Sequence, residues 1–390
     1  MTKIEWTEET WNPIAGCSLV SPGCTNCYAM TMAARIARMN PELEHYRGLT
    51  QSSKAGPVWT GKVALAPEHT LTAPLRRRKP TMYFVNSMSD LFHEDVPDEW
   101  IDRVFAVMAL CRDGASGADP HPREHTFQVL TKRSKRMQSY MTAGGVAARV
   151  MDAAELIACG GEKAKSWGPD WTMPWPLPNV WLGVSCEDQR RADERVPDLL
   201  ATPAAVRFVS AEPLLGPITF RVIEPDANTS INAIDGHTSY MAENYRERSP
   251  RLDWIIAGGE SGANARPMHP DWPRDIRDQC LSADAGGHPK REGEGADAGG
   301  HPKRPAERVA FFFKQWGAHA PASVVLPGDH LPDDADRMLP TGKARAGRLL
   351  DGREWNEYPA TLDGPSVAHQ QPQRCTDAER AGNRQQQEES

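Results

Sequence analysis

The amino-acid sequence predicts an α/β protein built as a complete or partial (β/α) barrel with parallel strands, with a cysteine loop after the first strand. Short apolar runs recur along the chain, and most of them do not alternate with polar residues, as is typical of strands buried on both faces. Helical stretches separate them, which implies parallel strands joined by right-handed crossovers. The runs cover residues 82–85, 127–130, 180–184, 206–209, 254–257 and 309–313.

A short strand before Cys17 brings the number of strands to seven, which fits a barrel better than a small open sheet. The chain has 390 residues, enough for one large barrel or two ordinary domains, and its 39% hydrophobic content allows a sizeable core. We expect residues 1–358 to form one barrel domain with insertions.

Charge and apolar run lengths exclude several classes of protein. The 45 basic and 52 acidic residues give a net charge of −7, which argues against a surface coated for nonspecific nucleic-acid binding. The first residues are too acidic for a signal peptide, and no apolar run approaches the length of a membrane-spanning helix. We therefore expect a cytoplasmic protein with no membrane partner. Clustered cysteines there indicate metal binding or chemistry more often than disulfides.

Three of the eight cysteines, Cys17, Cys24 and Cys27, lie within eleven residues at the spacing C-x6-C-x2-C. The residues between them are loop formers such as serine, proline, glycine and asparagine, so the thiols can surround a common centre. This loop indicates a metal site. The plainer interpretation is a structural or accidental group of cysteines.

The number of thiols bears on the kind of metal. Structural zinc is normally closed by four Cys or His ligands, whereas a [4Fe-4S] cluster held by three thiolates leaves one iron free to bind another molecule. Because a second C-x2-C pair is absent, we favour the cluster. Zinc is the alternative, completed by one of the remote cysteines Cys111, Cys159, Cys186 and Cys280.

Two helices are the clearest in the pattern. Residues 28–39 are rich in alanine, methionine and arginine and stop before Pro41. This helix starts directly after Cys27, so its positive dipole end would point towards an anionic cluster, although an ordinary core-packing helix accounts for the alanines equally well. Residues 98–111 form the second, with amphipathic spacing at Ile101, Val104, Phe105 and Met108.

Polar groups follow nearly every predicted strand. In barrels the chemistry lies at the carboxyl ends of the strands, so we expect these side chains to line a ligand site. They are Asn86, Ser87 and Asp90; Thr131, Lys132 and Arg133; Ser185 and Glu187; Ser210 and Glu212; Gly258, Gly259, Glu260 and Ser261; Lys314, Gln315 and Trp316.

Each of these groups also has a plainer interpretation. The basic residues at 132–136 could be a solvated helix start instead of an anion site. Glu212 could cap a turn, and the glycines at 258–259 could only allow close backbone approach. Asp90 and His93, among further acids, could bind a second metal, but such a run more often marks an exposed loop leading into a helix.

Several segments are expected as additions to the barrel. The segment 160–178, with its tryptophans Trp167, Trp171 and Trp175, suggests a lid, and residues 221–250 are polar without periodicity. An insertion at about 281–308 contains the same nine residues at 283–291 and 296–304, too polar to fold alone. The tail at 359–390 is expected to be disordered.

Residues 348–355 carry an Asp-Gly pair that is typical of a tight hairpin. A hairpin at this place could close the open edge of the barrel.

Six groups of short motifs span most of residues 1–360. They are Trp11-Asn12-Pro13 with Gly16-Cys17 and Cys24-Thr25-Asn26-Cys27-Tyr28-Ala29; Ser87-Met88-Ser89-Asp90-Leu91-Phe92; Leu182-Gly183-Val184-Ser185; Ser210-Ala211-Glu212-Pro213-Leu214; Gly258-Gly259-Glu260-Ser261-Gly262; and Phe313-Lys314-Gln315-Trp316-Gly317. This combination resembles an uncharacterised phage and prophage family, phage gene product thirty-seven/sixty-eight. That family in turn is similar to radical S-adenosylmethionine enzymes.

The resemblance implies a partial barrel in which the three cysteines hold a [4Fe-4S] cluster and the free iron binds S-adenosylmethionine. The usual loop of those enzymes is C-x3-C-x2-C with an aromatic before the last cysteine. This chain has six residues in the first gap and Asn26 before Cys27. The stretch Gly258-Gly259-Glu260 resembles the glycine-glycine-acid motif that holds the cofactor's amino end, but it follows about the sixth strand instead of the second.

The favoured function is therefore a radical S-adenosylmethionine-type enzyme. Glu212 and Lys132 are its candidate catalytic residues, and its candidate cofactor contacts are Ser185, Gly258, Gly259 and Glu260. Its substrate is unknown, and the phage setting implies nucleic acid or a nucleotide. One alternative is a noncatalytic partner protein stabilised by zinc or a cluster. Another is a metal-assisted hydrolase using Asp90, Glu212 and Glu260. Nothing in the sequence indicates an oligomeric state.

Overall fold

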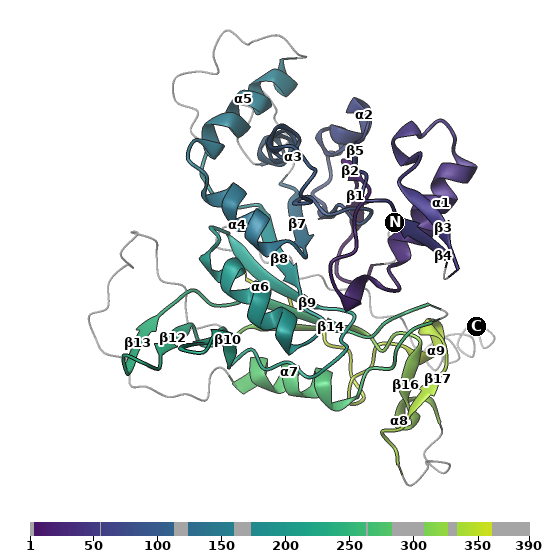
Figure 1. The fold of residues 1–390 in the computed structure, drawn as a ribbon, viewed down its shortest axis with the longest axis vertical. Helices are drawn as coiled ribbons and strands as arrows, with labels where there is room; N and C mark the ends of the chain where they lie inside the picture. Colours follow the sequence, from purple (N-terminus) through teal and green to yellow (C-terminus); the bar gives the residue numbers. More distant parts are fainter. Residues whose placement is uncertain are drawn as a thin grey trace, which may run out of the picture. The chain divides into compact units, whose positions relative to one another are not determined.

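A computed structural model describes residues 4–54, 56–112, 124–159, 173–262, 264–282, 308–326 and 334–360. Its centre is a parallel seven-stranded sheet in the order β1-β6-β7-β8-β9-β14-β15, curved into a half-barrel (Figure 1). The predicted α/β class and partial parallel barrel are confirmed. The strands are β1 (Glu9–Trp11), β6 (Met82–Val85), β7 (Thr126–Thr131), β8 (Val180–Ser185), β9 (Val206–Ala211), β14 (Trp254–Gly258) and β15 (Ala310–Gln315).

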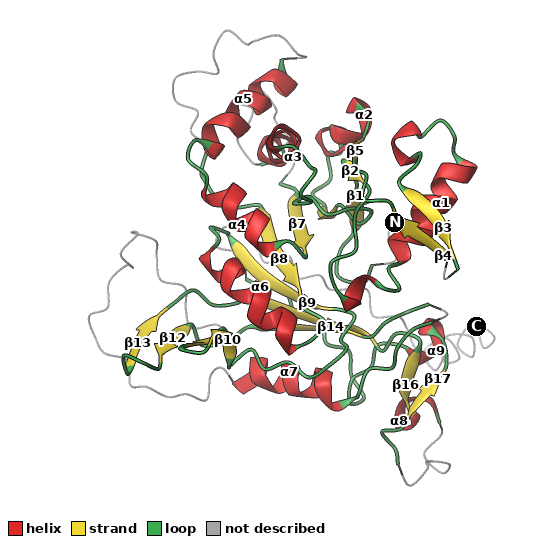
Figure 2. Cartoon of the chain, in the orientation of Figure 1, coloured by secondary structure: helices red, strands yellow, loops and turns green. Residues whose placement is uncertain are grey.

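Helices cover the outer face of this sheet (Figure 2). In the predicted amphipathic helix, now α3, the residues Ile101, Val104 and Phe105 are fully buried against the strands. The strand residues that point towards the helices, such as Val129 and Leu182, belong to the same core. The main helices between the strands are α3 (Asp98–Leu110), α4 (Ser134–Thr142), α5 (Val146–Ala158), α6 (Gln189–Ala201) and α7 (Asp271–Leu281).

The concave face of the half-barrel is filled by aromatic side chains. Trp6, from the segment before β1, lies 4.7 Å from the Phe84 ring and 6.1 Å from the Trp254 ring, measured between centroids. Phe208 packs so closely on β8 that a Cβ at Gly183 would lie 2.5 Å from its ring, so only glycine fits there. This apolar filling occupies the middle of the strands and leaves their carboxyl ends to polar groups.

Residues 14–66 form a cap with a core of its own. The predicted helix at 28–39 is confirmed as α1 (Tyr28–Met39), and its Ala29, Met30 and Ala33 pack against Trp59 and other residues of the cap. The other elements of the cap are β2 (Ile14–Ala15), η1 (Pro22–Cys24), η2 (Glu44–Tyr46), β3 (Thr50–Ser53), β4 (Gly56–Trp59) and β5 (Ala64–Leu65); α2 (Glu68–Leu71) and η3 (Ala73–Arg76) lead from it back to β6.

The segment 221–250, predicted to lack periodicity, instead forms an antiparallel four-stranded sheet. Its strands are four residues long, and Gly236 and Asn244, both with positive φ, lie in the connections between them. Strands this short show the two-residue period only once or twice, which is why the pattern was missed. The strands are β10 (Ile223–Asp226), β11 (Thr229–Asn232), β12 (His237–Tyr240) and β13 (Tyr245–Arg248).

Trp175 does not support the predicted lid. Its ring packs on Phe105 at 5.5 Å, and its indole Nε1 donates to the Met141 carbonyl at 3.1 Å, so it lies among the outer helices. The other expected additions, residues 160–172, the duplicated segment at 283–304 and the tail from 361, lie outside the described residues.

The predicted hairpin at 348–355 is confirmed. Asp351 and Gly352 have φ of 52° and 81°, as a tight turn requires. The chain after the turn lies along β15: the Phe313 amide donates to the Trp355 carbonyl at 3.0 Å, and the Glu357 amide to the Phe311 carbonyl at 3.2 Å. The hairpin thus covers the edge strand, as expected. Before it lie β16 (His319–Pro321), α8 (Ala322–Val325), β17 (Met338–Pro340) and α9 (Lys343–Ala346).

Within the described ranges, no helix has both the length and the apolar character needed to cross a bilayer.

Candidate functional site

The cysteine loop lies across the carboxyl ends of the parallel strands and is held there by three ion-paired anchors. Each anchor is a charged residue that follows a strand of the half-barrel and contacts the loop. The three are Arg133 after β7, Glu187 after β8 and Glu260 after β14. The sequence named all three as strand-end residues, but not as contacts of the loop.

Arg133 is buried, with 3% of its side chain exposed, and it contacts the carboxylates of Asp90 and Glu94. Of the two interpretations of this residue, the solvated helix start is therefore wrong. Its Nη2 donates to the Ser18 Oγ at 2.7 Å, and its Nη1 lies 3.6 Å from the Cys17 sulfur. Asp90 at 3.0 Å and Glu94 at 2.7 Å balance its charge. The buried cation therefore joins the loop to two acids.

His93 lies beside this anchor. Its Nδ1 accepts from the Asp95 amide at 3.1 Å, and its Nε2 lies 2.9 Å from the Ser18 hydroxyl. Burial lowers the pKa of His93, and the Arg133 charge lowers it further. Asp90 and His93 are both buried, so the expected exposed loop is wrong for these two residues.

Glu187 is fully buried and forms the second anchor. Its carboxylate accepts from the Gly23 amide at 3.1 Å and pairs with Arg195 at 3.1 Å. Burial alone would raise the pKa of Glu187, but a hydrogen bond from Ser21 and the Arg195 charge outweigh it and lower the pKa. The ionised carboxylate therefore holds the middle of the cysteine loop.

Glu260 forms the third anchor. Arg266 donates to both of its carboxylate oxygens, at 2.9 and 2.6 Å, and Asn26 donates at 3.0 Å. Arg266 also reaches the Pro22 carbonyl at 3.0 Å. Burial works against ionisation, but these hydrogen bonds lower the pKa of Glu260. Glu260, predicted as a ligand contact, is thus linked to the loop on both sides of Cys24, directly through Asn26 and through Arg266 to Pro22.

The glycine before Glu260 has a packing role. A Cβ at Gly259 would lie 2.0 Å from the Trp316 carbonyl oxygen, and one at Gly317 would lie 2.1 Å from the Glu260 carbonyl oxygen. The two backbones touch, as the plainer interpretation of this turn expected.

The three thiols influence one another. Burial raises the pKa of Cys17 to about 12, with a further rise from Asp90, whereas Arg133 lowers it. Burial also raises the pKa of Cys27, and the Lys132 charge lowers it. A charge on Cys24 would raise both values, so the thiols lie within electrostatic reach of one another. Within the part of the chain that the structure describes, no three Cys, His, Asp or Glu side chains are arranged to hold a metal ion.

The remote cysteines lie elsewhere. Cys111, Cys186 and Cys280 are buried in the core between the sheet and its outer helices, and Cys159 is exposed at the end of α5. The loop thiols Cys17 and Cys27 instead pack against the core of the cap.

A chain of polar side chains crosses the carboxyl ends of β7, β8, β9 and β15. The Lys132 Nζ donates to the Ser185 Oγ at 2.8 Å, and this hydroxyl donates to the Glu212 carbonyl at 3.2 Å. The Lys314 Nζ contacts both carboxylate oxygens of Glu212, at 2.6 and 2.8 Å. Gly258 borders the group, since a Cβ there would lie 3.3 Å from the Lys314 Cβ and 3.5 Å from the Glu212 Cδ.

Four predicted site residues, Lys132, Ser185, Glu212 and Gly258, thus lie together. Lys314 was predicted only as one of many strand-end groups, without a role. The sequence feature that indicates a role for Lys314 is its place two residues after Phe312. Alternate strand residues share a face, and the Phe312 ring fills the concave face.

This chain of side chains lies near the cysteine loop. The Lys132 charge acts on both Cys27 and Glu187. Tyr28, directly after Cys27, donates its hydroxyl to the Ser87 carbonyl at 3.0 Å. The arrangement places ammonium, hydroxyl and carboxylate groups at the strand ends near Cys27 and Glu187.

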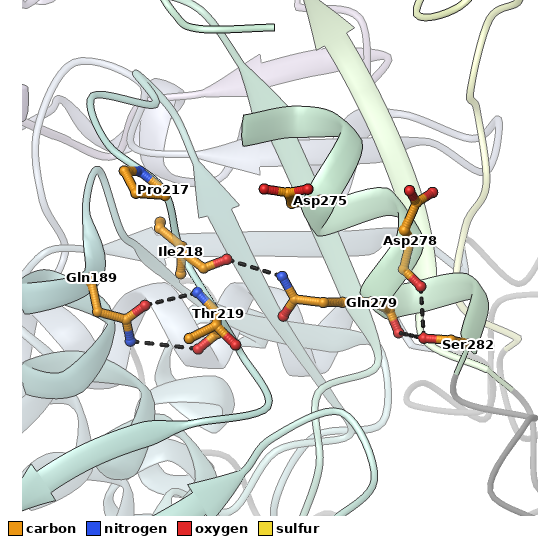
Figure 3. Close-up of a pocket in the computed structure, with 8 residues that line it drawn as sticks. All are labelled: Gln189, Pro217, Ile218, Thr219, Asp275, Asp278, Gln279 and Ser282. Carbon is orange, nitrogen blue, oxygen red and sulfur yellow. Dashed lines mark hydrogen bonds between the residues drawn. The ribbon is translucent and has the colours of Figure 1, made fainter. Parts of the chain in front are cut away.

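A surface groove lies between the start of α6 and helix α7 (Figure 3). Its polar groups satisfy one another: the Gln189 Oε1 accepts from the Thr219 amide at 2.7 Å, and Gln279 donates to the Ile218 carbonyl at 3.0 Å. None of the predicted site residues lines it. The groove is lined by Gln189, Pro217, Ile218, Thr219, Asp275, Asp278, Gln279 and Ser282.

Comparison with known proteins gives a family but no activity. No curated protein and no solved structure matches the chain. The sequence model of one family, described as a protein of unknown function (DUF5131), matches residues 1–299 and 302–359. The expected membership of an uncharacterised family is confirmed at this level. The chain belongs to this family of unknown function, DUF5131.

Proposed function

We propose that the protein is an iron-sulfur enzyme of the radical S-adenosylmethionine type, with Cys17, Cys24 and Cys27 as the cluster ligands. One observation carries the proposal. Three ion-paired anchors fix the three-cysteine loop over the carboxyl ends of parallel strands, beside a chain of polar side chains suited to a small ligand. Parallel barrels place their chemistry at this end of the strands.

The donor chemistry of the loop fits a thiolate-held cluster, although the three thiols are not arranged around one metal position in the described residues. The three thiols share one loop and lie within electrostatic reach of one another. Lys132 and Arg133 supply positive charge next to Cys27 and Cys17. The N-terminus of α1 directly follows Cys27 and adds its dipole. These positive groups favour thiolates, whereas burial raises the pKa of Cys17 and Cys27, so metal binding at these two thiols would release protons.

The remote cysteines favour a three-thiolate site. Cys111, Cys186 and Cys280 belong to the helix-side core and not to the core of the cap, so none of them is a natural fourth ligand for zinc. With three thiolates, a cubane cluster keeps one iron for a second ligand. The cluster, once bound, would supply the single electron with which enzymes of this type cleave S-adenosylmethionine.

The polar side chains at the strand ends suit the amino-acid end of S-adenosylmethionine, which carries a carboxylate and an ammonium group. The Ser185 hydroxyl can donate to a carboxylate, and the Glu212 carboxylate, which Lys314 also contacts, can accept from an ammonium. Gly258 lets its backbone approach Glu212 and Lys314 closely, since a Cβ there would already lie 3.5 Å from the Glu212 Cδ. Gly259 and Glu260 would contribute mainly by shaping the turn.

We assign the substrate to nucleic acid or a nucleotide, the class that the phage resemblance implies. The Lys132 ammonium lies at the strand ends and has no carboxylate among its hydrogen-bond partners within the described residues, whereas Lys314 is paired with Glu212. A cation of this kind suits a phosphate group. Glu212 and Lys132 would hold or move a proton at the reacting end of the bound substrate.

A metal-assisted hydrolase is less well supported. Each carboxylate that it would need already has a cation: Asp90 has Arg133, Glu212 has Lys314 and Glu260 has Arg266. A divalent metal would have to displace these cations.

The test is anaerobic purification followed by iron, sulfide and zinc analysis and a visible spectrum. Brown protein with about four irons per chain supports the proposal; colourless protein with stoichiometric zinc and no iron would refute it. S-adenosylmethionine is then titrated into the reconstituted protein, and 5′-deoxyadenosine is measured after reduction. A cluster without cofactor binding or cleavage would identify a cluster-bearing partner protein instead.

A further inference from the structure

We propose that Arg133 is a positioning residue that fixes the Cys17 sulfur, and through it the redox properties of the bound cluster. The part that concerns the cluster rests on the proposed function. The part that concerns the position of Cys17 depends only on the chain itself.

The three nitrogens of the planar Arg133 guanidinium contact different partners. The Nε contacts the Glu94 carboxylate at 2.7 Å, and the Nη1 contacts Asp90 at 3.0 Å and the Cys17 sulfur at 3.6 Å. The Nη2 donates to the Ser18 hydroxyl at 2.7 Å and lies 3.4 Å from the Ser18 carbonyl. Only a guanidinium offers donors in these fixed directions.

Charge balance alone does not require the contact with the loop. Asp90 has further donors in the Thr131 hydroxyl, at 2.6 Å, and the Lys132 amide, at 3.0 Å. Glu94 is 63% exposed, so water can solvate it. A cation that lacked the donors to Cys17 and Ser18 would still satisfy the two acids. The Arg133 donors that point to Cys17 and Ser18 therefore act on the loop.

The contact has a consequence for a metal at this loop. A donor that points at a ligand sulfur withdraws charge from it, and hydrogen bonds to the sulfurs are among the features that set the potential of iron-sulfur clusters. Contacts to metal ligands also fix ligand orientation, and their loss costs about 10- to 100-fold in metal affinity. Arg133 holds Cys17 in this way, whereas the hydrogen-bond partner that the described residues give Cys24 is the Ser21 hydroxyl.

The test compares Arg133→Lys and Arg133→Gln with the matched controls Arg136→Lys and Arg136→Gln. Arg136 lies on α4, the helix that begins directly after Arg133, and pairs with Asp98 away from the loop. Arg133→Lys keeps the charge for Asp90 and loses the planar donors. In reconstituted protein we expect the half-life of bound iron under a chelator to fall about tenfold. The midpoint potential should become more negative, because the sulfur loses a donor. The Arg136 controls should match the wild type.

A second measurement needs no metal. In the metal-free chain, maleimide labelling mapped by mass spectrometry should be faster at Cys17 in Arg133→Lys, which keeps a positive charge beside the thiol, and unchanged at Cys27. Amide exchange at residues 17–20 should also be faster. Folded Arg133 variants with unchanged labelling and exchange would overturn the inference. If the wild type binds no iron, the proposed function fails and labelling alone decides the role of Arg133. If Arg133→Gln does not fold, Arg133→Lys decides.

Discussion

The Arg266 guanidinium holds both carboxylate oxygens of Glu260, at 2.6 and 2.9 Å, and reaches on to the Pro22 carbonyl of the cysteine loop. This relationship makes Glu260 a clamp between β14 and the loop. Glu260 therefore helps to hold the loop in place, a role distinct from the ligand binding that the sequence suggested for it.

The clamp predicts a specific acid sensitivity. Hydrogen bonds and ion pairs lower the pKa of both Glu187 and Glu260 in the folded state, whereas an unfolded glutamate titrates near ~4.3. Their stabilisation is therefore fully present above the unfolded pKa and is lost as the pH falls through the lower folded values. We expect Glu260→Gln to lower the melting temperature at pH 7, with the difference from wild type shrinking towards pH 3.

The measurement is thermal unfolding across this pH range, with the exposed Glu243→Gln as control. A difference between Glu260→Gln and wild type that stays constant from pH 7 to pH 3 would show that the carboxylate charge does not hold the clamp.

The cysteines should divide into two groups. Cys17→Ala, Cys24→Ala and Cys27→Ala should each abolish metal retention but leave most of the fold, because the barrel core packs independently of the loop. Cys159→Ala, at an exposed helix end, should retain the wild-type metal content. Metal analysis and circular dichroism check both. If Cys111, Cys186 or Cys280 proves equally necessary for metal retention, a four-thiolate zinc site would be favoured instead.

The aromatic filling of the concave face should contribute strongly to stability. Trp6 is 2% exposed and contacts the rings of Phe84, Phe208 and Trp254. Trp6→Ala should lower the free energy of unfolding by about 3–5 kcal/mol, the usual cost of a large aromatic in a core. Denaturant titration measures this, and the exposed Tyr245→Ala on β13 is the control. A loss below about 1 kcal/mol would mean that the N-terminal segment does not fill the half-barrel.

The outline of the fold could be predicted because buried parallel strands leave a strong pattern. Runs such as 180–184 and 254–257 are apolar on both faces, and the strands they form share one sheet. Parallel topology also brings their ends together, so Lys132, Ser185 and Glu212 could be grouped in advance. The short strands of 221–250 left no such pattern.

The partners of the charged residues could not be predicted. Glu260 pairs with Arg266 six residues on, Glu187 with Arg195 across a helix turn, and Arg133 with acids about 40 residues earlier. Such pairs depend on side-chain directions in the folded chain, which residue spacing does not encode. For this reason the sequence left Arg133 open between a solvated helix start and an anion contact, and it named Glu260 only as a candidate ligand contact.

The last prediction concerns the neighbouring glycines Gly258 and Gly259. Any side chain at Gly259 would collide with the Trp316 carbonyl oxygen, which lies 2.0 Å from an ideal Cβ. Gly259→Ala should therefore destabilise the fold by about 1–3 kcal/mol or more, so it cannot report on a cofactor.

At Gly258 the nearest atom is the Lys314 Cβ at 3.3 Å, a contact that a small shift can relieve. Gly258→Ala should fold and keep its iron, because the thiolates lie on another loop, yet it should weaken S-adenosylmethionine binding beside Glu212. Cofactor titration of the reconstituted variant, with iron content measured on the same sample, checks this. Wild-type affinity in Gly258→Ala would place the cofactor away from Glu212 and Lys314.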